Sequence, residues 1–221
     1  MRFAVILVNS MQVSIVMRHM LRSMTTNPRP TRAEMLDVAS AVFESADAVV
    51  LGEETAIGNF PIESVRTMAS IITNAEEATH YYALHSFSRD FSAKPFTSLE
   101  ASSYCLARMA LDADVAAVVT FTANGSPAQI CTKYRPPVPH FVATTEKDVA
   151  ESANLYFGMR GCLLKSSKQS VHDSLSFVLS EARSQGLYSG GKVAVMHGHT
   201  NLFADQGGTL SIVDPGQPCA G

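Results

Sequence analysis

Short apolar runs alternate with amphipathic stretches along this chain, and the alternation predicts an α/β protein. Continuous apolar runs are typical of parallel strands covered on both faces, whereas apolar residues at helical spacing indicate surface helices. The strands are expected at residues 48–51, 115–121, 141–144, 160–164, 192–197 and 210–213. The helices are expected at residues 31–43, 62–80, 97–111, 128–134 and 171–185, and Thr145 is expected to cap one more helix that follows it. This rhythm favours a mostly parallel sheet covered by helices.

Helix ends are marked by local signals. Thr31 with Glu34, and Thr97 with Glu100, both have the Thr-x-x-Glu spacing of a capping box, in which two side chains satisfy free backbone N–H groups of the first turn. Gly186 follows the last predicted helix, as expected of a left-handed cap. Between residues 81 and 96 the apolar pattern is lost and Ser, Lys and Pro accumulate. We therefore expect a first part over residues 1–82, with about the first 12 residues unassigned, a linker at 83–96, and a second domain over 97–221.

Composition narrows the class of protein further. Apolar residues make up 46% of the chain and charged residues 17%, and the net charge is −3. This is an ordinary globular balance, and it gives no electrostatic argument for binding nucleic acid or an acidic membrane. No apolar run approaches the roughly 20 residues of a membrane-spanning helix. The four cysteines form no Cys-x-x-Cys pair, so we expect reduced thiols and a cytoplasmic location.

Several motifs together resemble one enzyme family. Residues 27–34 read Asn-Pro-Arg-Pro-Thr-Arg-Ala-Glu, which resembles a signature of the pyruvate kinase family almost letter for letter. Ala-Asp-Ala-Val-Val-Leu at 46–51 and Glu-Thr-Ala at 54–56 follow in register, and Lys-Tyr-Arg-Pro at 133–136 is similar to a motif of the family's C-terminal domain. The resemblance implies the last two β/α units of a TIM barrel followed by a five-stranded α/β pyruvate kinase C-terminal domain.

The resemblance also implies that catalytic groups are missing. Pyruvate kinases transfer a phosphoryl group from phosphoenolpyruvate to ADP, using magnesium and potassium whose ligands come from earlier barrel strands. In the family a threonine near the start of this region is implicated in protonating the enolate, and Arg18 stands at its position. Arginine does not release a proton at neutral pH. We therefore expect a truncated, glycolytic-type family member without activity of its own and without a cofactor. Alternatively, the chain is part of an active pyruvate kinase whose N-terminal half is missing from this sequence.

One candidate binding site remains in the second domain. Thr122, Asn124, Gly125 and Ser126 correspond to a loop that holds a phosphate of a phosphorylated sugar effector in many family members. Hydroxyl and N–H groups at a helix N-terminus suit such an anion. However, residues 199–209 contain no Arg or Lys, and an ordinary strand–helix turn is the alternative. The resemblance further implies a homo-oligomer, or a complex with a full-length pyruvate kinase subunit, formed through the helix at 97–111.

A metal pair at His197 and His199 is the remaining candidate. Alternate residues of a strand point the same way, so two imidazoles at this spacing can approach one ion. No third ligand stands nearby in the sequence. We therefore predict no metal site.

Overall fold

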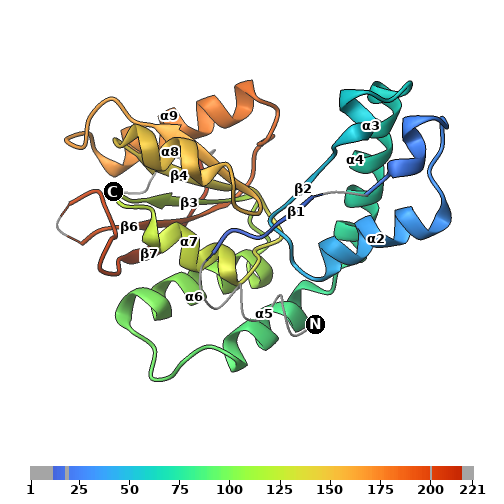
Figure 1. Cartoon of the computed structure of the whole chain (residues 1–221). Coiled ribbons are helices and arrows are strands. Elements are labelled where there is room, and N and C mark those ends of the chain that lie inside the picture. The colour runs from blue at the N-terminus through green and yellow to red at the C-terminus, as the bar shows by residue number, and fades with distance from the viewer. Residues whose placement is uncertain (1–11, 18–19, 200, 216–221) are drawn as a thin grey trace. The chain divides into compact units, whose positions relative to one another are not determined.

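The computed structural model describes residues 12–17, 20–199 and 201–215. The chain divides into two compact units, Met1–His80 and Tyr81–Gly221 (Figure 1). Each unit has its own buried core.

The first unit is a piece of a parallel β/α structure. Its elements are β1 (Ile15–Met17), the 3-10 helix η1 (Arg22–Thr25), α2 (Arg32–Phe43), β2 (Ala48–Val50), α3 (Glu53–Ala56) and α4 (Pro61–Ala78). Strands β1 and β2 pair in parallel, with Val16 opposite Val49. The buried residues Leu21, Met24 and Val38 form the centre of its core. The first unit is therefore a segment of a barrel, as predicted, with a two-stranded parallel sheet among its described residues.

The start of α2 is tied to the preceding segment by one carboxylate. The predicted capping box is confirmed: the Glu34 N–H donates to Thr31, and the Glu34 side chain accepts from the Thr31 N–H. The same carboxylate accepts from the N–H of Ser23 at 2.7 Å and from its hydroxyl at 2.5 Å. Burial raises the pKa of Glu34, but the hydrogen bonds from Ser23 and Thr31 outweigh it, so the pKa is lowered overall.

The second unit is a five-stranded α/β domain, as predicted. Its helices are α5 (Tyr81–Asp90), α6 (Ser98–Asp112), α7 (Ser126–Lys133), α8 (Lys147–Ala153) and α9 (Val171–Ser184). Its strands are β3 (Ala117–Phe121), β4 (His140–Thr144), β5 (Met159–Leu163), β6 (Val193–His197) and β7 (Thr209–Val213). The sheet order is β5-β4-β3-β6-β7, and β7 alone runs antiparallel to its neighbour.

Helices cover both faces of this sheet, which explains why its central strands carry apolar residues on both faces. Helix α9 packs on one face, where Leu175 and Val178 meet Val119 and Val195. Helices α6 and α7 pack on the other face. All five residues of β3 and all five of β4 are buried. The buried His140 lies between the hydroxyls of Thr120 (2.8 Å) and Thr132 (3.4 Å), and burial lowers its pKa to about 3.

The segment expected to be a linker contains a helix. Helix α5 occupies residues 81–90, and the second compact unit begins with it. The helix packs on α6, where the Tyr82 hydroxyl donates to the Leu111 carbonyl at 2.7 Å. Its buried positions are His85 and Ser88, polar residues that a search for apolar periodicity does not count.

Two of the predicted caps differ from the structure. Thr97 does accept from the Glu100 N–H at 3.1 Å, but the Glu100 carboxylate turns to Lys133 instead of closing the box. The N-cap of α8 is Glu146, whose N–H donates to the hydroxyl of Thr144, so the predicted cap at Thr145 is wrong. The left-handed residue after α9 is confirmed, because Gly186 has a φ of 71°.

Candidate functional site

The predicted loop lies at the point where the sheet changes its winding direction. Strand β3 is central, with β4 on one side and β6 on the other. The loop after β3 and the connection after β6 therefore meet at the carboxyl ends of adjacent parallel strands. In open α/β sheets, this crevice is where ligands bind.

The four predicted residues come together in one tight turn at the start of α7. The buried Thr122 hydroxyl accepts from the Gly125 N–H at 2.9 Å, and the Asn124 side-chain oxygen accepts from the Ser126 N–H at 2.9 Å. Gly125 is the N-cap and has a φ of 83°, a left-handed conformation that favours glycine. The local sequence thus builds the turn that the prediction required.

The donors of this turn already face an anion of the same chain. The Thr122 hydroxyl donates to the Asp205 carboxylate at 2.5 Å. The Ala123 N–H is 3.2 Å from each oxygen of that carboxylate, and the Asn124 N–H is 3.5 Å from one of them. Asp205 belongs to the connection between β6 and β7 (Figure 1). The turn therefore binds a carboxylate from the neighbouring connection.

No cationic side chain is contributed by either loop. Residues 122–126 and 198–209 contain neither Lys nor Arg. The carboxylate is held by one hydroxyl, by backbone N–H groups and by the partial positive charge at the N-terminus of α7.

Sequence reasoning missed Asp205. The signal that could have found it is an acidic residue, the only charged one between residues 200 and 209, in the connection after the last parallel strand. Its side chain lies 83 residues from Thr122 in sequence, so only the sheet order brings the two together.

The other predicted positions do not join this site. Arg18, which the resemblance predicts at the position of the family threonine, lies outside the described residues. His197 Nδ1 lies 2.8 Å from the Gly198 carbonyl, and His199 Nδ1 lies 3.0 Å from the Thr209 hydroxyl. Among residues 12–17, 20–199 and 201–215, no group of three or more His, Cys, Asp or Glu side chains could hold a metal ion.

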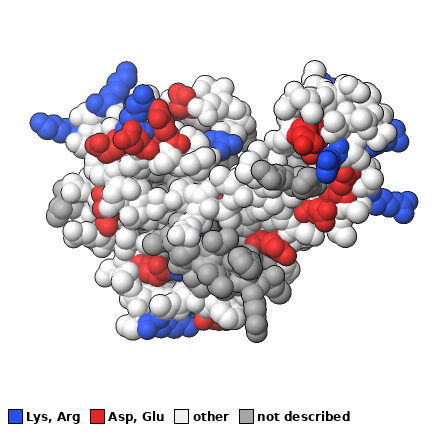
Figure 2. Space-filling view, viewed as in Figure 1, with Lys and Arg blue, Asp and Glu red and all other residues white. Residues whose placement is uncertain are grey.

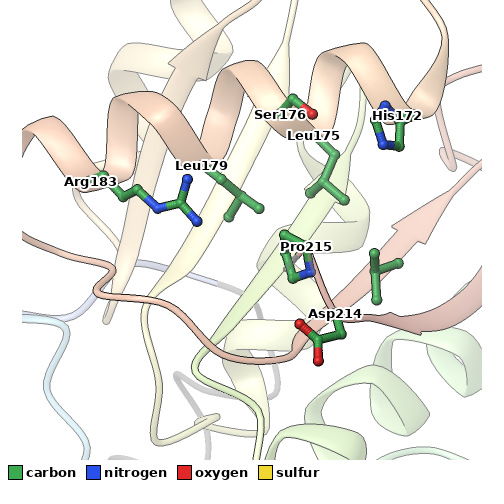
Figure 3. Close-up of a pocket in the computed structure, with 8 residues that line it drawn as sticks. His172, Leu175, Ser176, Leu179, Arg183, Asp214 and Pro215 are labelled. Carbon is green, nitrogen blue, oxygen red and sulfur yellow. The ribbon is translucent and has the colours of Figure 1, made fainter. Parts of the chain in front are cut away.

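A separate hollow lies beside α9, with a volume of about 150 Å³. Figure 3 shows His172 and Arg183 of α9 on one side and Asp214 and Pro215, just after β7, on the other. None of the four predicted loop residues lines it.

Figure 2 shows acidic and basic side chains on the visible face in small groups of both signs, with large neutral areas between them. No helix among the described residues is long and apolar enough to cross a bilayer.

Comparison with known proteins gives the same two-part division. A family model described as pyruvate kinase, barrel domain, matches residues 6–65, and one described as pyruvate kinase, alpha/beta domain, matches residues 100–212. Pyruvate kinase 2 of Saccharomyces cerevisiae is 36% identical over 181 residues, which is 80% of this chain and 36% of that protein. A pyruvate kinase of Bacillus licheniformis is 38% identical over 185 residues, covering 83% of this chain and 30% of the relative.

A solved structure agrees with the sequence relatives. The crystal structure of a pyruvate kinase from Cryptosporidium parvum superposes with a TM-score of 0.86 at 29% identity, covering 96% of this chain and 42% of that one. The chain thus spans well under half the length of the relatives that it matches.

Proposed function

Because this chain belongs to the pyruvate kinase family, we propose that it acts as an association module of that family without catalysing phosphoryl transfer by itself. The observation that carries the proposal is the difference between the β-sheets of the two units. The second unit has a five-stranded sheet with cores on both faces. The described part of the first unit supplies two parallel strands, whereas a closed barrel has eight.

The chemistry of phosphoryl transfer supports the proposal. Such transfer depends on positioning and on neutralising charge with cations in a closed site. In this family we expect those groups on barrel strands that have no counterpart in this sequence. By the resemblance, Arg18 stands where the family has its one catalytic group in this region. We do not extend the proposal to effector binding, because the donors of the 122–126 turn already face Asp205.

The proposed partner surface is the outer face of α6. Leu106, Ala107 and Ala110 point into the core, whereas Cys105 is exposed on the opposite side. On that side the small side chains of Ala101 and Cys105 are one turn apart, and the ion pair of Arg108 and Asp112 continues the same face. The partner is a second copy of this chain or the matching helix of a full-length subunit.

Cys105→Arg is therefore expected to weaken self-association. A bulky cation on the outer face of α6 must be desolvated in the interface, and we expect the dissociation constant to rise about 10-fold or more. Sedimentation equilibrium over a range of concentrations measures this constant. Ser180→Arg, on the exposed side of α9, introduces the same side chain away from α6 and should leave the constant unchanged. A wild-type chain that stays monomeric both alone and with a full-length pyruvate kinase would contradict the proposal.

A further inference from the structure

Asp205 occupies the crevice at which an α/β sheet of this topology binds its ligands. The turn after β3 directs a hydroxyl and two N–H groups at its carboxylate. These are the donors that an incoming anion would need, and they lie at the carboxyl ends of β3 and β6. The carboxylate takes the place of an external ligand.

The backbone around Asp205 fixes the carboxylate in this place. The Ala204 N–H donates to the Phe121 carbonyl at 2.9 Å, so the residue before Asp205 is anchored to the end of β3. The Gly207 N–H donates to the Ala204 carbonyl at 2.9 Å, which turns the chain directly after Asp205. At Gly208, a Cβ atom would lie 2.2 Å from the His197 carbonyl oxygen, so the connection passes close to the end of β6 at a position that only glycine can occupy.

From these contacts we infer that Asp205 is an internal anionic ligand, which closes the 122–126 turn to phosphate groups and fastens the β6–β7 connection to the β3–α7 turn. A phosphate group at the same donors would have to displace the carboxylate or lie beside it. Lying beside it places like charges next to each other with no Lys or Arg in either loop to separate them. Asp205 thus determines which ligands the turn accepts, a role independent of association through α6.

The test is amide hydrogen exchange, followed by NMR on the full chain, together with a titration. In Asp205→Ala we expect the N–H groups of Ala123 and Asn124 to exchange at least about 10-fold faster than in the wild type, because they lose a charged acceptor. Asp205→Asn keeps one acceptor oxygen without the charge, and should show a smaller acceleration. In the wild type, inorganic phosphate at neutral pH should leave the amide signals of residues 122–126 unmoved.

Asp148→Ala is the matched control, since it removes an exposed carboxylate from the first turn of α8. It should change neither the amide exchange rates of residues 122–126 nor their response to phosphate. Unchanged exchange in both Asp205 variants would overturn the inference, and so would saturable phosphate-induced shifts of the wild-type turn.

Discussion

Gly161→Ala is expected to cost about 3 kcal/mol or more of the free energy of unfolding, because strand β5 and helix α8 touch at this residue. A Cβ atom on Gly161 would lie 1.9 Å from the Ala150 carbonyl oxygen and 2.7 Å from its Cα. Both are backbone atoms of α8, so no rotation of a side chain relieves the clash. The helix must move away from the strand.

Moving α8 would open the small core beneath it. Ala153 of α8 packs there with Ala128, Val142 and Met159. The same movement would break the contact of the Gly161 N–H with the Asn154 side chain, which also donates to the Ala150 carbonyl. The loss of packing adds to the direct repulsion.

Urea unfolding followed by circular dichroism measures this effect. Gly186→Ala is the control, because no atom lies within 4 Å of its added Cβ and its cost comes only from a φ of 71°. That backbone strain amounts to about 1–2 kcal/mol. Equal losses of unfolding free energy in Gly161→Ala and Gly186→Ala would contradict the close packing of α8 on Gly161.

Glu100→Ala is expected to cost about 3–5 kcal/mol, since it leaves a buried ammonium group without its partner. The Glu100 carboxylate accepts from Lys133 Nζ at 2.8 Å and from the Tyr134 hydroxyl. The Lys133 side chain is only 7% exposed. Burial, with the hydrogen bond to Glu100, raises the pKa of Tyr134, so the phenol stays protonated and donates.

A second substitution separates the buried charge from the loss of contacts. Glu100→Ala combined with Lys133→Met removes both charges and should regain much of the lost stability. Glu151→Ala breaks the pair of Lys147 and Glu151, whose side chains are 74% and 66% exposed, and should cost less than about 1 kcal/mol. A double variant no more stable than Glu100→Ala would contradict the account of the cluster.

The elements that the sequence predicted are those whose signals are local or periodic. Central strands such as β3 and β4 are buried on both faces, so their apolar runs were recognisable. Thr31 and Glu34 are three residues apart, and the capping box between them formed as expected. The turn at residues 122–126 was predictable because its residues are neighbours in the sequence, so its signal is local.

The missed features depend on contacts between distant segments. Helix α5 buries polar residues against α6, which no apolar pattern reports. Glu100 had the spacing of a capping box, but Lys133 and Tyr134, more than 30 residues away, offered its carboxylate stronger partners. Asp205 reaches Thr122 only because β6 pairs with β3, and that strand order is a property of the whole sheet.

Pyruvate formation from phosphoenolpyruvate and ADP tests the central claim most directly. The purified full chain would be assayed at high concentration with magnesium and potassium in a lactate dehydrogenase-coupled assay. A parallel preparation from cells that do not express the chain would serve as a control for contaminating kinase. We expect no turnover above that control. Turnover above it, rising in proportion to the concentration of the chain, would contradict the account and require a catalytic site within these 221 residues.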